Sequence, residues 1–448
     1  MGNTMNLDTI APKKYTLFDL HDINSGIVNY VTEIENELNH PEIFVVAATS
    51  CDLQKYGLPV TYKVNGSGAG LSLETAKLSA IGETLERYCL SIIDPDDLLL
   101  STGTDLREQN KLFVPPEKWS LFGSDQQIVP FTRFDENALI TWRIADSLVD
   151  RVEKYVPASL VYLPYYYHFR DSLGEQMISP SISTGAACAQ SKEEAILKGI
   201  AELIERDSFM IMWKNRIPCR KITIDSKSKI YDTYKTKFCR PGIDFSLYYT
   251  TFDLGMPSFF GIVTDTRGTY ISRVVGGAAH PDPEVAALKT VLELVQGLVW
   301  KDYKGEVKLP IVPDFENIKS FESRMELYAY NDMSAALEFL PTDESLLLSE
   351  IPVAYNYEKG NFKEALKNII AAFSAKDYDI LAVDMSSIEA DFCGVHIVKV
   401  LIPALEAMDG EHQFQYLGGK RWKEVPVACG YRNPEDQIIL NPFPHPYP

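Results

Sequence analysis

Residues 65–88 read NGSGAGLSLETAKLSAIGETLERY, in which a glycine-rich segment comes directly before a long run with helical spacing. Ser72 is a good N-cap residue and the run stops before Asp94 and Pro95, so the pattern predicts a helix over residues 72–93. The preceding segment LPVTYKVNGSGAG predicts a strand that ends in a glycine-rich turn. A strand, a loop of small residues and a helix therefore make the first predicted unit.

The same order of strand, small-residue loop and helix recurs twice along the chain. SPSISTGAACAQ introduces a predicted helix over residues 192–214, and Pro281 and Pro283 stand at the start of a third predicted helix. Because helices and short strands are mixed, and some strands follow one another directly, we expect an α+β fold with mixed sheets packed with helices. The other predicted elements are strands at 40–52, 158–169, 378–385 and 395–403 and an amphipathic helix at 362–375.

The first two predicted helices each carry Glu-x-x-Glu-Arg on an otherwise apolar surface. At about 100° per residue, Ser79, Glu83 and Glu86 lie within about 60° of one another, and Arg87 lies about 40° beyond Glu83. The polar stripe of the second helix consists of Glu194, Lys198, Glu202, Glu205 and Arg206.

A single Glu-x-x-Glu-Arg is most often a solvated, self-paired helix surface, because i,i+4 ion pairs form readily there. Two copies on helices that are apolar over most of their circumference instead indicate buried carboxylates, which must be paired or bind a metal. The glutamates of the two motifs outnumber the cations beside them, so we expect bound Mg²⁺ together with a nucleotide phosphate. Two interpretations of Glu194 stay open. It belongs either to this nucleotide and metal site or to a capping box, which the segment from Ser191 to Glu194 also fits.

Composition excludes several classes of partner. The formal net charge of −19 argues against a nucleic acid or an anionic membrane as partner. Seven scattered cysteines without zinc-type spacing indicate reduced thiols, and no apolar run approaches the ~18 residues of a membrane span. We therefore expect a soluble cytoplasmic protein. Because no Walker A segment is present, any ATP site must be of another type.

The chain ends in NPFPHPYP, with proline at every second position from 442 to 448. A frayed terminus or a polyproline ligand is the ordinary explanation for such an end, but the spacing never supplies P-x-x-P. An extended segment would instead place the prolines on one face and Phe443, His445 and Tyr447 on the other. The last seven residues reach about 20 Å. We therefore predict that this tail lines the active site and orients the substrate, with Pro444, Pro446 and Pro448 at the catalytic centre.

At these segments the sequence resembles the YcaO family. NGSGAGLSLETAKLSAIGETLERY and STGAACAQSKEEAILKGIAELIERDSF resemble its two ATP-binding segments, and VVGGAAHPDPEVAALKTVLELVQ and VKVLIPALEAM resemble later family blocks. The resemblance spans residues 22–448. It implies an N-terminal segment (1–60) that joins the core, a catalytic domain (61–430) and a proline-rich tail (431–448) that reaches the active site.

The resemblance also implies roles for single residues. Those expected to bind ATP are Ser79, Glu83, Glu86, Arg87, Gln190, Glu194, Lys198, Glu202, Glu205 and Arg206. Those expected to bind Mg²⁺ are Glu83, Glu86, Glu202 and Glu205. Two residues depart from the pattern, because Ala189 stands where many relatives have glycine and Gln190 replaces a commoner Asn or Pro.

The activity implied by the resemblance is ATP-dependent modification of a peptide backbone amide. In the azoline-forming branch, whose members also end in Pro-x-Pro-x-Pro, a Cys, Ser or Thr of a ribosomal precursor peptide becomes a thiazoline or (methyl)oxazoline. Implied partners are the precursor peptide, a leader-binding protein of the ubiquitin-activating-like class, an FMN dehydrogenase and a second copy of the chain. Thioamide or amidine formation and a non-catalytic peptide-docking scaffold remain the alternatives.

Overall fold

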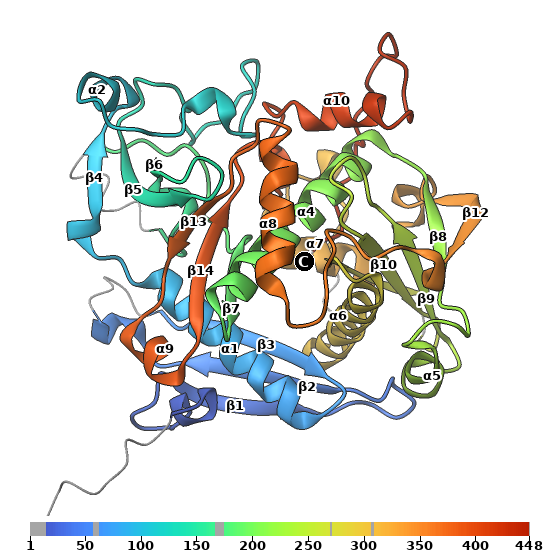
Figure 1. Cartoon of the computed structure of the whole chain (residues 1–448). Helices are drawn as coiled ribbons and strands as arrows, with labels where there is room; N and C mark the ends of the chain where they lie inside the picture. The colour runs from blue at the N-terminus through green and yellow to red at the C-terminus, as the bar shows by residue number, and fades with distance from the viewer. Residues whose placement is uncertain (1–14, 57–61, 166–173, 269–270, 306–308, 448) are drawn as a thin grey trace, which may run out of the picture.

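The structure is a computed structural model that describes residues 15–56, 62–165, 174–268, 271–305 and 309–447 (Figure 1). Its described strands form three sheets, with helices between and around them, so the α+β prediction is confirmed. All seven cysteines are free thiols. None of the described helices combines the length and the apolar character that crossing a bilayer requires.

The three sheets differ in size and in strand direction. The first is antiparallel with the order β1-β2-β3, and the second has the order β11-β10-β9-β8-β12, in which only β12 and β8 are parallel. The third has the order β4-β5-β13-β14-β7, with β6 paired to β5. The strands are β1 Val28–Ile34, β2 Phe44–Ser50, β3 Asn65–Gly70, β4 Leu98–Ser101, β5 Ile140–Ser147, β6 Glu153–Pro157, β7 Ala186–Ala189, β8 Cys219–Thr223, β9 Ile243–Tyr249, β10 Ser258–Asp265, β11 Ser272–Ala279, β12 Pro341–Leu347, β13 Leu381–Asp384 and β14 His396–Leu401.

The four helices that the apolar spacing predicts are present as α1, α4, α6 and α8, and the other five described α-helices were not predicted. Ser72 caps α1 by accepting a hydrogen bond from the amide of Thr75, and Ser191 caps α4 through the amide of Glu194. Asp282 caps α6, with Pro283 as its first residue. The described helices are α1 Leu73–Ser91, α2 Gly103–Glu108, α4 Lys192–Asn215, α5 Tyr231–Thr233, α6 Pro283–Lys304, α7 Phe321–Tyr330, α8 Phe362–Ser374, α9 Ile388–Cys393 and α10 Arg421–Ala428.

The glycine-rich segment is a strand and not the predicted turn. Asn65–Gly70 pairs along its whole length with β2, and α1 packs directly against it. A Cβ atom on Gly66 would lie 2.7 Å from the carbonyl oxygen of Ala80, and one on Gly68 would overlap that of Ala76. Glycine has a low strand propensity, so the sequence favoured a turn, whereas close helix packing selects glycine on this face of the strand.

The strand predicted at 158–169 is wrong in its first part. Ala158–Leu160 forms a 3₁₀ turn that follows β6, and Tyr165 is buried. Residues 166–169, which we expected in the core or at a dimer surface, lie outside the described residues. The apolar and aromatic run indicated a strand, but the chain turns as soon as β6 ends.

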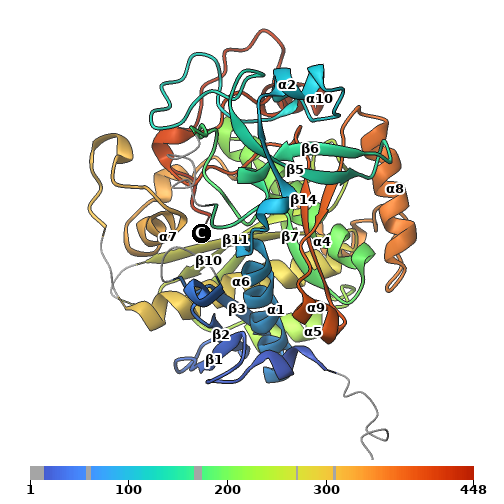
Figure 2. The same ribbon diagram turned by 90° about the vertical axis from the view of Figure 1, so that its left-hand side faces the viewer.

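The three long helices meet between the sheets. Helix α1 packs on β3 and β7, α6 packs on β11 and β3, and α4 packs on β14, β7 and β11 (Figure 1). Helix α4 is buried along most of its length. The C-terminal end of the chain lies near β10, β11 and α7 (Figure 2). There Tyr447 packs against Phe260 of β10, and Tyr328 of α7 donates to the carbonyl of Pro444.

Candidate nucleotide and magnesium site

Three helices direct polar side chains with identical spacing toward one region. The positions i, i+4 and i+7 are Ser79, Glu83 and Glu86 on α1, Lys198, Glu202 and Glu205 on α4, and Lys289, Glu293 and Gln296 on α6. Glu202 acts electrostatically on Glu83, Glu86, Glu205 and Glu293. We call Glu83, Glu86, Glu202, Glu205 and Glu293 the glutamate cluster.

Three glutamates of the cluster are each held by a backbone amide outside their own helix. One amide lies in β3, one directly before β7 and one in β11, so each comes from a different sheet. The pairs are Ser67 with Glu83 at 2.6 Å, Gly185 with Glu202 at 3.0 Å and Gly277 with Glu293 at 3.0 Å. Packing of the sheets around the helices therefore sets the direction of the carboxylates.

The cluster is poor in positive charge. Burial raises the pKa of Glu86 to about 8, and repulsion from Glu202 and Glu83 adds to the shift. Burial likewise raises the pKa of Glu205 to about 8, although Arg206 opposes it, and it raises the pKa values of Glu83 and Glu293. Glu86 makes neither a hydrogen bond nor an ion pair with any described residue. Such a group of carboxylates is stabilised by a bound cation.

The predicted cations pair with single members of the cluster. Arg87 contacts Glu83 at 2.7 Å and also donates to the carbonyl of Asn65. The Nε atom of Arg206 lies 3.3 Å from Glu205 and has no hydrogen-bond partner among the described residues. Both guanidinium groups therefore retain donors for a phosphate.

The remaining predicted ligands lie toward the first turn of α4 and on the exposed side of α1. The carboxylate of Glu194 pairs with Lys198 at 3.0 Å, while the backbone amide of Glu194 donates a hydrogen bond to the hydroxyl of the N-cap residue Ser191 at 3.2 Å. Gln190 is exposed directly before α4, and Ser79 is exposed on α1. The structure thus uses Glu194 on its own helix, but through an ion pair with Lys198 and not through a reciprocal capping box.

Sequence reasoning missed the stripe on α6. Lys289 is exposed on α6. Partial loss of hydration and the positive charge of Lys198 lower its pKa. The negative charges of Glu205, Glu194 and Glu293 oppose this shift. The electrostatic interactions with Glu205, Glu194 and Glu293 associate Lys289 with the cluster and with the first turns of α4. The signal was present, because positions 289, 293 and 296 repeat the spacing of the other two stripes. The helix was predicted from the spacing of its apolar residues alone, so its polar stripe was not identified.

Lys399 of β14 is a second cation that the sequence did not indicate. Its ammonium group is buried and donates to the carbonyls of Ile182 and Thr184, at 2.8 Å each. Burial lowers its pKa to about 8, against the attraction of Glu202 and Glu86. A lysine in a predicted strand is expected to be exposed. Lys399 is buried because α4 packs on β14.

These residues fit ATP with Mg²⁺. The candidate metal ligands are all carboxylate oxygens, which is the donor type that Mg²⁺ takes, and the raised pKa values show that the cluster lacks a countercharge. No three of the described carboxylates in the cluster bring oxygens within 4.8 Å of one another. That spacing suits Mg²⁺, which keeps several waters and phosphate oxygens, better than a closed protein cage. Arg87, Arg206 and Lys289 are the side chains available to phosphate.

A tighter acidic group lies elsewhere, where Glu37, His40 and Asp302 bring ligand atoms within 4.8 Å. The Nε2 atom of His40 lies 3.1 Å from Asp302 and 2.8 Å from the guanidinium of Arg267. Lys301 also contacts Asp302 at 2.8 Å. Two side-chain cations already neutralise this group, so it does not have the charge deficit of the glutamate cluster.

The C-terminal tail meets the cluster through Tyr447. The tyrosine hydroxyl donates a hydrogen bond to Glu205 at 3.0 Å, and the guanidinium of Arg206 lies 4.3 Å from the ring centre. The hydroxyl occupies the space that a side chain at Gly277 would need. Tyr447 is completely buried.

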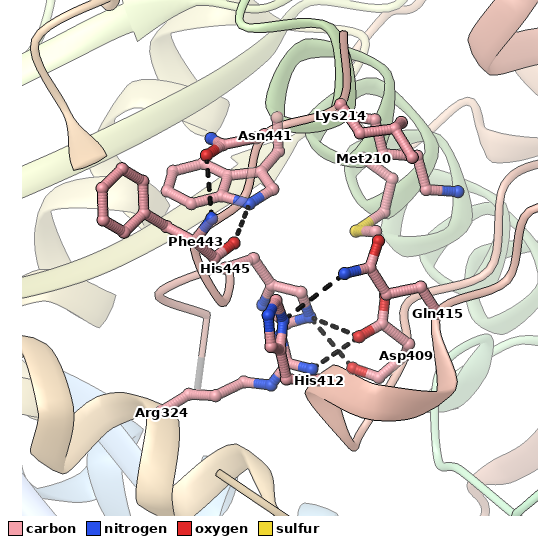
Figure 3. A pocket seen from close by; sticks show the side chains of 11 residues that line it. Met210, Lys214, Arg324, Asp409, His412, Gln415, Asn441, Phe443 and His445 are labelled. Atoms are coloured by element: carbon pink, nitrogen blue, oxygen red, sulfur yellow. Dashed lines mark hydrogen bonds and ion pairs between the residues drawn. The ribbon is translucent and has the colours of Figure 1, made fainter. Parts of the chain in front are cut away.

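A small pocket holds the preceding part of the tail (Figure 3). Trp213 donates to the carbonyl of Phe443 at 3.2 Å, and His445 contacts the carbonyl of Asp409 at 2.9 Å. Arg324, which is fully buried, pairs with Asp409 at 2.5 Å (Figure 3). The cavity left among these groups is about 10 Å³, which is room for one water molecule.

The predicted catalytic prolines lie along this segment. Pro444 and Pro446 are buried, and the contact recorded for Pro444 is the hydrogen bond that its carbonyl accepts from Tyr328 at 2.7 Å. Pro448 lies outside the described residues. Tyr447, and neither Pro444 nor Pro446, makes the hydrogen bond between the described part of the tail and the cluster. The catalytic role of the prolines stays a prediction.

Comparison with known proteins agrees with this site. The family model described as YcaO cyclodehydratase, ATP- and Mg²⁺-binding, matches residues 67–406. An uncharacterized protein of Methanothermobacter thermautotrophicus is 24% identical over 346 residues, which are 76% of this chain and 81% of that protein.

Two solved structures share the fold. A heterocyclase in complex with substrate and cofactor has a TM-score of 0.74 and 24% identity, over 96% of this chain and 56% of that one. YcaO from Methanopyrus kandleri, bound with AMPPCP and Mg²⁺, has a TM-score of 0.59 and 17% identity, over 85% of this chain and 86% of that one. The chain thus spans little more than half the length of the heterocyclase.

Proposed function

Because the chain belongs to the YcaO family of ATP- and Mg²⁺-binding cyclodehydratases, we propose that it converts Cys, Ser or Thr of a ribosomally made precursor peptide to thiazoline or (methyl)oxazoline. The observation that carries this proposal is the contact between Tyr447 of the proline-rich tail and Glu205 of the glutamate cluster. The contact supports the proposal because azoline-forming members have a tail of this kind, and Glu205 is one of the groups that suit ATP and Mg²⁺.

The chemistry requires a better leaving group than an amide oxygen. ATP, bound with Mg²⁺, supplies a phosphoryl group, so that the oxygen of the attacked carbonyl leaves as phosphate and the ring gains a C=N bond. With ATP and Mg²⁺ bound, the glutamates would hold the metal, and Arg87, Arg206 and Lys289 would neutralise phosphate oxygens. The buried tail keeps water from the far end of the cluster, which protects the phosphorylated amide from hydrolysis.

The tail favours ring formation over the other reactions that this fold could catalyse. Thioamide formation needs room for an external sulfur nucleophile, whereas azoline formation uses a nucleophile that the peptide itself carries. Tyr447 fills the space between Glu205 and Gly277, so the cluster is closed on that side. A closed site suits an intramolecular attack.

The partners are proposed from the family to which the chain belongs. We expect a leader-binding protein of the ubiquitin-activating-like class to present the precursor peptide. An FMN dehydrogenase would act on the azoline afterwards, and a second copy of the chain is an expected partner.

The proposal is tested by incubating the protein with ATP, Mg²⁺, a candidate precursor peptide and its leader-binding partner. We expect the peptide to lose one water mass per ring, with one ADP and one phosphate formed for each ring, as measured by mass spectrometry and a coupled ADP assay. A peptide that gains sulfur, or ADP release without any loss of mass, would contradict the proposed reaction.

Glu83→Ala separates an enzyme from a peptide-docking scaffold. Glu83 is anchored by the amide of Ser67 within the cluster, so its loss should reduce ring formation by about 100-fold or more. Glu74→Ala is the matched control, because Glu74 is an exposed residue in the first turn of the same helix. Full activity of Glu83→Ala in the assembled system would favour the scaffold.

A further inference from the structure

A second cavity, of about 70 Å³, adjoins the glutamate cluster. Arg206 and Lys399 lie between the cavity and the glutamate cluster, because each lines the cavity and each interacts electrostatically with Glu202. The cavity lies beside the middle of α4, on the side of Arg206, whereas Glu194 and Lys198 lie one to three turns nearer the N-terminus of that helix. The rest of its wall is mainly aliphatic and includes Leu160, Ile182, Leu203, Leu401, Leu405 and Met408.

Lys399 and Glu406 on this wall already have partners, and Arg206 lies between the glutamate cluster and Tyr447. The ammonium group of Lys399 donates to the carbonyls of Ile182 and Thr184, and the guanidinium of Arg206 lies over the ring of Tyr447. Glu406, also on the wall, is buried and pairs with Lys214 at 3.0 Å. A charged or amide side chain that entered this cavity would lose its hydration for few new hydrogen bonds, whereas an aliphatic one would lose nothing.

We propose that the cavity binds the aliphatic side chain of the residue next to the cyclised Cys, Ser or Thr of the substrate peptide. The proposal rests on the proposed function, because it requires a peptide amide at the cluster within one residue of the wall that Arg206 and Lys399 form. Neighbouring residues of an extended peptide are about 3.3–3.6 Å apart along the chain, so a flanking side chain reaches the wall that Arg206 shares with the cavity. The volume is far below the roughly 300–1,000 Å³ of pockets for whole ligands, and it suits one side chain.

The nucleotide is a poorer occupant of this cavity. The side chains that suit its phosphates lie on α1, on α4 and on the Lys289 stripe of α6. The cavity is instead built from one side of α4, from β14 with the segment that follows it, and from residues 119–121, Leu160, Ile182 and Thr184. A purine also carries ring nitrogens and an amino group that need hydrogen-bond partners, and this aliphatic wall offers few. A flanking aliphatic side chain fits both the size and the chemistry.

The test compares synthetic peptides with a single Cys that differ only in the flanking residue, Leu or Gly, placed before the Cys in one pair and after it in another. With the full-length protein, we expect the Leu peptide of one pair to have a kcat/KM at least about 10-fold above that of its Gly counterpart. Ala407→Phe, which adds a ring at the cavity wall, should remove this preference and leave the Gly peptide unchanged. Leu160→Ala should extend the preference to a flanking Phe.

Ala371→Phe is the matched control, because Ala371 is an exposed residue of α8 away from the cavity lining. Binding of the same peptides, labelled with a fluorophore and followed by anisotropy, is the second readout. A Leu preference in binding that Ala407→Phe removes, without any ring formation, would support the cavity and contradict the proposed function. Ring formation that is equal for Leu and Gly in both pairs would overturn the cavity while the function stands, and equal binding without ring formation would overturn both.

Discussion

The hydroxyl of Tyr447 links the described part of the tail to the glutamate cluster through its hydrogen bond to Glu205. Tyr447→Phe removes this bond and keeps the ring that packs against Phe209 and Arg206. A hydrogen bond to a charged group contributes about 1.5–3 kcal/mol, so ring formation should slow by roughly 10- to 100-fold while the melting temperature changes little. The measurement is kcat for ring formation together with a thermal melt.

The control for this variant is Tyr330→Phe. Tyr330 is also buried, and its hydroxyl donates to the carbonyl of Lys301 at 3.0 Å, away from the cluster. If both variants retain full activity, Tyr447 only fills space. If both lose activity in proportion to their loss of stability, the effect of Tyr447 is structural and does not act on Glu205.

Lys289 is the cation of the cluster that is most open to solvent. Burial and the positive charge of Lys198 lower the pKa of the Lys289 ammonium group. A negatively charged ligand beside it would stabilise its charged form. Lys289→Gln should weaken the binding of a non-hydrolysable ATP analogue by about 10- to 100-fold, as measured by calorimetry. Lys304→Gln, at the exposed end of the same helix, should leave it unchanged. Equal affinities for both variants would exclude Lys289 from the phosphate site.

At the scale of the helices, the cluster should couple Mg²⁺ binding to pH. The pKa of Glu86 is raised from 4.5 to about 8, so in the metal-free protein this group contributes stability below pH about 4.5 that is lost as the pH rises through about 8. Mg²⁺ competes with the proton. Its affinity should therefore increase by up to about tenfold for each pH unit between 6 and 8, per proton displaced.

The measurement is the Mg²⁺-induced increase in melting temperature at pH 6, 7 and 8. Glu86→Gln, which carries no titrating group, should show a smaller increase and a flatter dependence on pH than the native protein. A Mg²⁺ effect that is independent of pH in the native protein would contradict the coupling. The same would follow if Glu86→Gln left the dependence unchanged.

At the scale of the whole molecule, the tail is part of the core. His445 and Tyr447 are buried, and Tyr447 packs with Phe209 and Phe260. From the sequence we expected that removing the last five residues would abolish cyclisation and leave the fold intact. The loss of one buried aromatic side chain alone costs about 3–5 kcal/mol, so we now expect the truncated protein to be inactive and also less stable. A truncated protein with native melting temperature and native turnover would show that the tail serves neither purpose.

Glutamates at i, i+4 and i+7 on apolar helices were visible in the sequence, because helical periodicity is local and needs no knowledge of the fold. The spacing of Glu83 and Glu86, and of Glu202 and Glu205, therefore predicted both stripes and a cation site. The same rule would have found Lys289, but a charged residue within an apolar helix cannot be distinguished from a solvent-facing one without its neighbours.

The sequence by itself determined the three long helices, their caps, the polar stripes on two of them and the alternation of the tail, because each depends on residues within a few positions of one another. Only the tertiary structure decided that 65–70 is a strand, that Lys399 is buried and that Tyr447 reaches Glu205. Each of these depends on elements far apart in the chain that pack together. Local propensity carries no information about such contacts, and here packing outweighs it.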